Sequence, residues 1–176
     1  MILYILGILT LLFTFSAYLQ KNRIKFLILN TSAIVTIGMS FYLKGGYVGA
    51  FSEFLMFVVH ITAIMFNDDI RKRLSIFVPP LIFASYVYLH GTSLCYELIM
   101  PIIMSFFVLG AYQTNMIKNK IYFMLGLSLM SIYSFIIGTN LILISNLIGI
   151  IILYKTYDEL KAEKRNINAY NKAHKG

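Results

Sequence analysis

The sequence predicts an all-α integral membrane protein with seven transmembrane helices, arranged as two parallel three-helix repeats joined by a linker helix. Three observations predict this class. Seven apolar stretches alternate with short loops, 59% of the 176 residues are hydrophobic while 12% are charged, and positive charge is concentrated in every second loop. Soluble domains carry about 25% charged residues, so this chain has too little polar surface to cover a water-soluble domain.

Each apolar stretch has about the length that a membrane-spanning helix needs. A helix rises ~1.5 Å per residue and crosses the ~30 Å hydrocarbon core in about 17–25 residues. The stretches lack the two-residue alternation of barrel strands, so we expect helices. They lie at about residues 2–19, 24–43, 48–66, 74–90, 94–113, 121–138 and 141–157.

The distribution of Lys and Arg predicts the direction of each helix. With seven spans and the N-terminus outside, every Lys and Arg except Lys44 falls on the cytoplasmic side, as the positive-inside rule requires. The fourth span carries Pro79 and Pro80 near its start, a place where a helix tolerates proline. If this span did not cross, most of the positive charge would lie outside. The C-terminus is therefore predicted to be cytoplasmic.

The spans divide the chain into four predicted parts. Residues 1–66 form a first three-helix unit, 67–93 a linker helix, 94–157 a second three-helix unit and 158–176 a polar cytoplasmic tail, helical at first and then mobile. The single linker helix makes the two units parallel. Some transporters are built from such parallel repeats and bind substrate between them. A duplicated bundle without a transport path is the alternative.

A family resemblance supports this layout. The chain resembles the bacterial inner-membrane family called YgjV, and its 3+1+3 plan looks like the wider SWEET/PnuC-type (MtN3-type) superfamily of small-solute transporters. The segments that carry the closer resemblance are FSAYLQKNRIKFLILN, GGYVGAFSEFL and LGAYQTNMIKNKIYFMLGLSL. The resemblance implies a multi-pass protein of the bacterial cytoplasmic membrane. The proline-glutamine signature of the sugar transporters and the tryptophans of the nicotinamide-riboside transporters are both missing, so neither substrate is implied.

Three residues are candidates for substrate binding. Glu53 is the one acid well inside a predicted span, and such residues normally face the bundle interior or water. The repeat alignment pairs it with Asn146, and the SWEET resemblance implies an asparagine pair at these places. The alternative is that Glu53 reaches the headgroups. His60 lies on the same helical face as Glu53 and could relay a proton, although a histidine bonded to a neighbouring helix is more usual.

Two residues are candidate hinges. Pro101 removes a hydrogen bond to the Glu97 carbonyl and should kink the fifth span. Its repeat partner is Gly7 in the first span. Both weaken a helix at the same depth, as a rocking transporter requires. A static kink that only helps packing is equally compatible with the pattern.

The remaining functional expectations follow from motifs that are missing. The sequence has no catalytic triad, phosphate loop, CxxC or metal-ligand cluster, so we expect no enzyme, no cofactor and no metal. The Lys and Arg residues form no single patch, which argues against nucleic acid. The partners are then the lipid bilayer and a small polar solute held at a site walled by spans one, two, five and six; a homo-oligomer is left open. The alternative is a non-transport interaction or regulatory protein.

Overall fold

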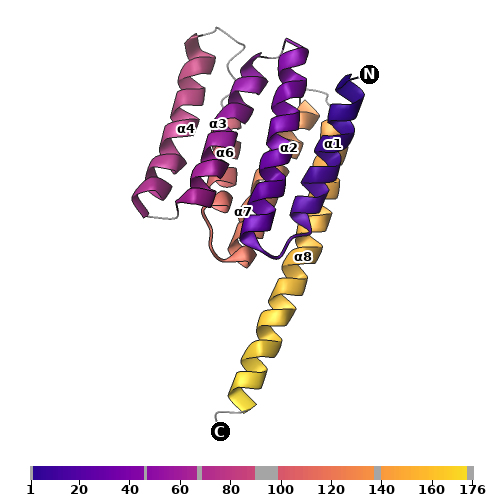
Figure 1. Cartoon of the computed structure of the whole chain (residues 1–176), viewed down its shortest axis with the longest axis vertical. Coiled ribbons are helices and arrows are strands. Elements are labelled where there is room, and N and C mark those ends of the chain that lie inside the picture. Colours follow the sequence, from indigo (N-terminus) through magenta and orange to yellow (C-terminus); the bar gives the residue numbers. More distant parts are fainter. Residues whose placement is uncertain (1, 46, 67–68, 90–98, 137–139, 174–176) are drawn as a thin grey trace.

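The computed structural model describes residues 2–45, 47–66, 69–89, 99–136 and 140–173, and these residues form seven α-helices and no strand (Figure 1). The all-helical prediction is therefore confirmed for the described part of the chain. The helices are α1 (Ile2–Tyr18), α2 (Arg23–Leu43), α3 (Tyr47–Met65), α4 (Asp69–Leu89), α6 (Ile99–Ala111), α7 (Met116–Ile136) and α8 (Asn140–Ala173).

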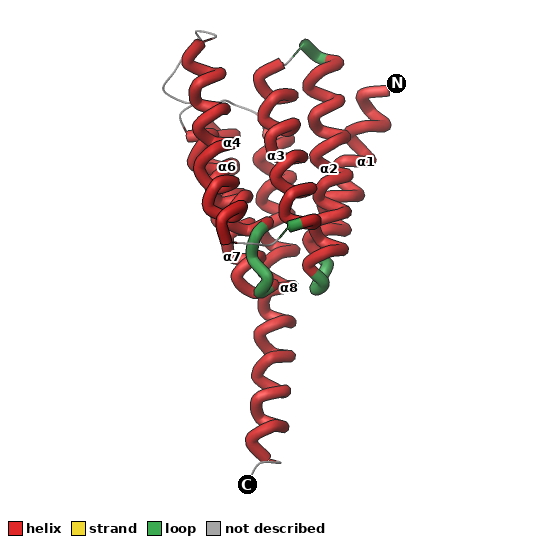
Figure 2. Tube along the Cα trace, turned by 60° about the vertical axis from the view of Figure 1, so that its left-hand side comes forward, coloured by secondary structure: helices red, strands yellow, loops and turns green. Residues whose placement is uncertain are grey.

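The helices run up and down between two ends of one bundle. Helices α1, α3 and α6 end, and α2, α4 and α7 begin, at what we call the basic end, from which α8 projects (Figures 1 and 2). At this end α2 starts on an N-cap, where the Asn22 side chain accepts a hydrogen bond from the Lys25 backbone N–H at 3.1 Å. Asn115 plays the same part before α7, accepting from the Ile117 N–H at 3.0 Å. Asparagine is among the best N-caps, which explains why both helices start here.

Six helices form a closed ring, and the seventh lies outside it. Each ring helix packs on its neighbours in the order α1, α2, α3, α6, α7, α8 and back to α1, while α4 packs on α3 and α6. The first three helices therefore adjoin the last three at two seams, α3 with α6 and α1 with α8. The helix predicted as a linker covers the first of these seams.

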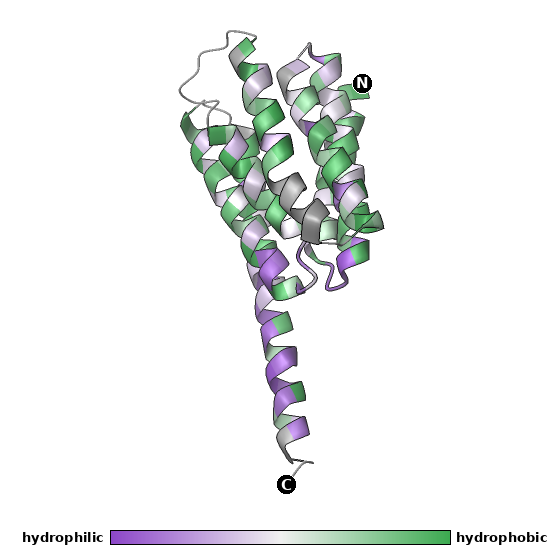
Figure 3. Cartoon of the chain, turned by 90° about the vertical axis from the view of Figure 1, so that its left-hand side faces the viewer, coloured by the Kyte–Doolittle hydropathy of each residue, from purple (hydrophilic) through white to green (hydrophobic). Residues whose placement is uncertain are grey.

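The helices of the bundle consist largely of hydrophobic residues, and the projecting part of α8 is mostly hydrophilic (Figure 3). By length and composition, one described helix, Arg23–Leu43, is long and apolar enough to cross a bilayer, and shorter apolar helices lie at Ile2–Tyr18, Gly49–Met65, Phe77–Val87 and Ile99–Ala111. Large apolar side chains point outward along the bundle, including Phe77 and Ile151, 70% and 68% exposed. Exposing so much apolar surface to water is unfavourable, whereas contact with lipid is favourable.

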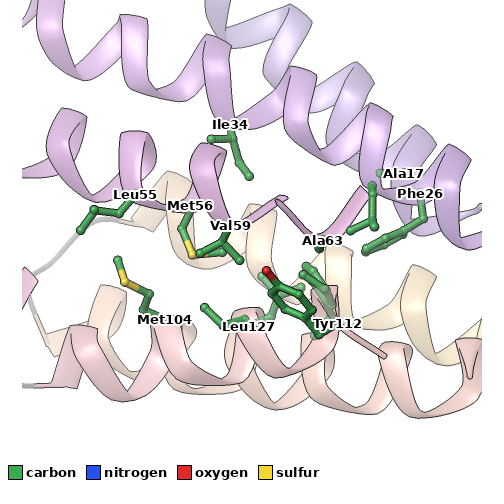
Figure 4. Packing of buried hydrophobic residues seen from close by; sticks show 14 of the residues in the cluster. Ala17, Phe26, Ile34, Leu55, Met56, Val59, Ala63, Met104, Tyr112 and Leu127 are labelled. Carbon is green, nitrogen blue, oxygen red and sulfur yellow. The ribbon is translucent and has the colours of Figure 1, made fainter. Parts of the chain in front are cut away.

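The interior is a continuous hydrophobic core that joins the two groups of three helices. Phe26 of α2 and Phe123 of α7 meet within it, edge to face, with ring centroids 4.7 Å apart. Met56 and Val59 of α3 lie opposite Met104 of α6 across the first seam (Figure 4). Packing of this kind, together with hydrogen bonds, drives helix association in membranes, because lipid supplies no hydrophobic force between helices.

Two details of the predicted helices are wrong. Helix α4 starts at Asp69 instead of residue 74, so Pro79 and Pro80 lie inside the helix and not in its first turns. The part of the tail predicted to be mobile, after about residue 165, is instead part of α8, a helix of 34 residues that ends at Ala173. Both changes have one cause: polar residues next to an apolar run can continue its helix, and hydropathy marks only the apolar part.

Candidate functional site

Two cavities meet at Glu53 of α3. The interior cavity, about 40 Å³, lies at the first seam between α3, α6 and α7. The lateral crevice, about 260 Å³, lies between α2 and α3. Glu53 is the one residue that lines both. The carboxyl therefore lies where the inside of the bundle approaches its apolar outer face.

The interior cavity has an unusual wall. Half of its lining residues are methionines, and the others are two polar residues and two apolar ones. The full set is Ser52, Glu53, Met56, Met100, Ile103, Met104, Phe107 and Met130. Ser52 donates its hydroxyl to the Gly49 carbonyl at 2.8 Å, so the Glu53 carboxyl and four thioethers are the groups left to contact a ligand.

The lateral crevice is larger and more apolar. Phe54 and Phe57 of α3 and Ile34, Val35 and Met39 of α2 supply most of its wall. Phe54, Val35 and Met39 are 58%, 42% and 51% exposed, so the crevice opens on the surface that would meet lipid. Its polar element is Glu53.

Helix α2 approaches Glu53 closely because Gly38 has no side chain. A Cβ placed on Gly38 would lie 3.3 Å from the Glu53 Cβ, tighter than ordinary van der Waals contact. Within the described residues the Glu53 carboxyl makes no hydrogen bond and no ion pair. Glu53 is half-buried. An acid without a partner inside a helix bundle is costly to stability, and such residues usually mark a functional site.

Asn146, which the repeat alignment pairs with Glu53, lies apart from Glu53 in the structure, and its predicted role in substrate binding stays a prediction. Asn146 lies on α8 and lines neither cavity, and α3 and α8 are not neighbours in the ring. Its amide Nδ2 is nonetheless buried and has no hydrogen-bond partner in the part of the chain that the structure describes. Asn146 is thus a second unpaired polar group inside the bundle, apart from the Glu53 cavities.

His60 is a buried and fully bonded side chain. Its Nδ1 lies 2.9 Å from the Met56 carbonyl, and its Nε2 lies 2.9 Å from the Asn30 amide nitrogen of α2. A carbonyl oxygen can only accept, so Nδ1 carries the proton and Nε2 accepts from Asn30. Both ring nitrogens are occupied, and His60 lines neither cavity. In this structure His60 links α2 to α3, and its predicted role in substrate binding stays a prediction.

The two candidate hinges lie in different surroundings. Gly7 is exposed on α1, and a Cβ added there would meet nothing within 4 Å. Pro101 is the third residue of the described helix α6. Glu97, whose carbonyl Pro101 is predicted to leave unbonded, lies outside the described residues. The structure shows no close contact that explains the glycine, and the predicted kink stays a prediction.

At the basic end, Arg23 joins the two groups of helices. Its guanidinium Nη2 donates to the Ala63 carbonyl in the last turn of α3, at 2.8 Å, and to the Ala111 carbonyl at the end of α6, at 3.0 Å. The last carbonyls of a helix have no partner within the helix and carry partial negative charge. The first residue of α2 therefore holds the ends of two other helices together.

Lys120 makes the reciprocal contact. Its Nζ donates to the Tyr18 carbonyl at the end of α1, at 2.8 Å, and lies 4.5 Å from the centre of the Phe26 ring. The side chain is fully buried. Thus a cation on α2 binds the end of α6, and a cation on α7 binds the end of α1. We call these two contacts the basic-end clasp.

Sequence reasoning missed several of these residues. Lys120 was predicted to be a loop charge, but it lies inside α7 and is buried. The four cavity methionines looked like ordinary apolar residues of separate spans. A lysine one residue before an apolar span is a weak signal for Lys120. No local signal brings the methionines together, because they come from three helices.

The walls of the two cavities differ from those predicted for the substrate site, which were spans one, two, five and six. The interior cavity is lined from spans three, five and six, and spans one and two contribute none of its residues. Span two lines only the lateral crevice, and span one lines neither cavity. The ring order explains this, because α3 and not α1 adjoins α6.

Comparison with known proteins identifies one family. The family Imp-YgjV, described as a bacterial inner membrane protein, matches residues 1–163. The chain matches no curated protein. It matches no solved structure either.

Proposed function

We propose that this chain, which belongs to the Imp-YgjV family of bacterial inner membrane proteins, is a small-solute transporter with a SWEET-like plan of two three-helix units. The observation that carries the proposal is the position of Glu53. Its carboxyl lines a cavity at the seam between the units and makes no bond within the described residues. Ionisable groups inside membrane proteins are expensive and usually serve ion or substrate pathways.

The orientation in the membrane is part of the proposal. The N-terminus lies outside and the basic end lies in the cytoplasm, because positive residues favour that side. Lys21 supports the placement of α8, since its Nζ lies 3.4 Å from Glu159 and 3.6 Å from Glu163. The projecting part of α8 is then a cytoplasmic helix.

The basic-end clasp is proposed to be the cytoplasmic gate. Transporters with repeats of this kind expose a site to each side in turn by rocking one unit against the other. Both clasp contacts cross between the units, and both join a side chain to a helix end instead of two packed helices. They can break without unfolding a helix. The structure then represents a state that is closed to the cytoplasm.

An interaction protein is the second candidate. The observation that favours it is the exposed part of α8, which extends well beyond the bundle (Figures 1 and 2). Nearly every residue there is exposed, including Ile167 and Tyr170 at 56% and 63%. A partner protein could bind this helix. Such a role would need neither the cavity nor Glu53.

Uptake into proteoliposomes tests transport. Liposomes carrying the protein are incubated with a small-molecule extract of bacteria, and their contents are compared by mass spectrometry with those of protein-free liposomes. We expect one solute class to accumulate, and Glu53→Gln to abolish this. Asn146→Ala tests the second unpaired group. If liposomes with the protein and protein-free liposomes take up the same solutes at the same rates, the protein is not a transporter of this kind.

Spin labels test the gate without a substrate. Leu19 and Thr114 follow α1 and α6 at the basic end, and both are exposed. Labels on cysteines at these sites, in a Cys95→Ser background, report the distance between the units. Rocking predicts two distance populations in lipid nanodiscs, with the longer one enriched when Lys120→Met removes one of the two clasp contacts. One narrow distance in both proteins would contradict the gate.

A further inference from the structure

We infer that the interior cavity binds a soft monovalent metal cation, of the Cu(I) or Ag(I) type, through the thioethers of its four methionines, with the Glu53 carboxylate balancing the charge. The binding site stands on the geometry alone. Only its role as the substrate site of a transporter rests on the proposed function.

The ligand set favours a soft ion. Thioether sulfur is a soft ligand that selects Cu(I) and similar ions, whereas Mg²⁺ and Ca²⁺ require oxygen, and Zn²⁺ is held by imidazole, thiolate or carboxylate. Four of the chain's nine methionines line this one cavity. No group of three or more His, Cys, Asp or Glu occurs among the described residues. Within that part of the chain, a hard or borderline metal has no comparable set of ligands.

The four methionines converge from three helices. Met100 and Met104 are four residues apart on α6, so they lie one above the other on the same helical face. Met56 and Met104 both point into the space between α3 and α6 (Figure 4). Met130 closes the wall from α7. An ion bound here would touch both units of the ring, since α3 belongs to the first and α6 and α7 to the second.

The size of the cavity points to an ion. A cavity needs roughly 10–15 Å³ to hold one water molecule, and a cavity of about 150 Å³ holds benzene. The interior cavity measures about 40 Å³. It therefore has room for a dehydrated ion.

The single carboxylate in the cavity wall favours a monovalent cation. Glu53 is the one charged residue in the wall of the interior cavity. A monovalent cation and one carboxylate form a neutral pair. A divalent cation would leave an uncompensated positive charge in an apolar interior, which is strongly unfavourable. Thioethers add soft ligands without adding charge, so the four methionines leave this balance unchanged.

The competing explanation is that the methionines only fill space. Methionine is flexible and commonly occupies irregular gaps in a core. Leucine can fill such gaps as well, and Met-to-Leu exchanges conserve volume and are among the best tolerated in cores. Leucine has no sulfur. A Met-to-Leu exchange therefore separates metal binding from packing, and the variants are expected to fold.

The experiment measures Cu(I) and Ag(I) binding by purified protein in lipid nanodiscs. Every variant is made in a Cys95→Ser background, because a thiol would bind the same ions. Cu(I), kept reduced with ascorbate, is competed against bathocuproine disulfonate, and Ag(I) is added as the nitrate. The test variant is Met56→Leu with Met104→Leu. The matched control is Met65→Leu with Met116→Leu, which lie outside the cavity.

We expect one ion per chain in the starting protein. The affinity should fall at least about tenfold, or ~1.4 kcal/mol, in the cavity double variant and in Glu53→Gln. It should not change in the control, and excess Na⁺ or Zn²⁺ should not displace the ion. No binding in the starting protein overturns the inference, as does equal binding by the cavity variant and the control.

The same proteins distinguish this inference from the transport proposal. Metal binding with no metal uptake into proteoliposomes, and with a single spin-label distance, would sustain the metal site and end the transport proposal. Uptake of another solute by a protein that binds neither ion would end the metal site and sustain transport.

Discussion

Replacing Glu53 by leucine should make the protein more stable while it removes function. Glu53 lies between two cavities and has no bonding partner within the described residues. A side chain that serves ligand binding and not folding lowers the stability of the protein when the ligand is absent. The sign of the stability change therefore distinguishes a binding residue from a structural one.

The size of the effect follows from the position of the residue. At the centre of a membrane span an acidic residue costs about 2.5–3.5 kcal/mol, and leucine contributes about −0.3 to −0.6 kcal/mol. Glu53 lies in the first half of the 19-residue helix α3, nearer to an end, so we take about half of this difference. The expected gain is ~1.5–2 kcal/mol, which corresponds to a rise of roughly 3–8 °C in Tm for a chain of this size.

Thermal unfolding in detergent, followed by the helical circular dichroism signal, measures the gain. Fluorescence is less useful because the chain has no tryptophan. Glu53→Gln keeps the shape and a polar group, so its Tm should lie between those of the starting protein and Glu53→Leu. The Leu exchange does not disturb the contact with Gly38, because that contact involves the Cβ atom, which both side chains have.

A lower Tm for Glu53→Leu would refute this reasoning. It would mean that the carboxyl makes a stabilising hydrogen bond, since the loss of such a bond costs about 1–3 kcal/mol. Glu53 would then be a structural residue, and neither the transport site nor the metal site could depend on it.

Three further predictions concern residues outside the two cavities. Asn30→Leu should lower stability by about 1–3 kcal/mol, because it leaves the buried Nε2 of His60 without its partner at 2.9 Å; a neutral effect in a melt would show that this bond does not link α2 to α3. Gly126→Ala should destabilise by ~1–3 kcal/mol through overpacking, because its Cβ would lie 2.6 Å from the Phe107 ring. Gly7→Ala meets nothing within 4 Å and should stabilise α1 by up to about 1 kcal/mol. If Gly7 is a hinge, proteoliposome uptake by Gly7→Ala should fall although stability rises, and unchanged uptake would remove it as a hinge.

Local patterns explain the predictions that hold. Helices and their rough positions could be predicted because an apolar run and its flanking polar residues are read along the chain itself. Asn22 and Asn115 cap the starts of α2 and α7 at the basic end, and each cap also depends only on neighbouring residues. Helix ends were less predictable: α8 continues into polar sequence that hydropathy does not recognise.

The site depends on contacts that no local pattern contains. Lys120 looked like one more basic loop residue, yet it binds the carbonyl of Tyr18, which is 102 positions away. Glu53 could be singled out from the sequence because an acid in an apolar run is costly wherever the run packs. The residues around Glu53 do not show whether it comes close to its predicted partner, Asn146. The ring order places the two on helices that are not neighbours.

The sequence by itself determined that the chain is helical and apolar, roughly where its helices lie, and that Glu53 is exceptional, because each of these depends on the chemistry of neighbouring residues. The tertiary structure decided which helices adjoin. That order set α3 against α6, gathered Met56, Met100, Met104 and Met130 around the carboxyl, and closed the basic end with two reciprocal contacts. Packing between helices brings distant residues together, and their spacing along the chain does not encode that proximity.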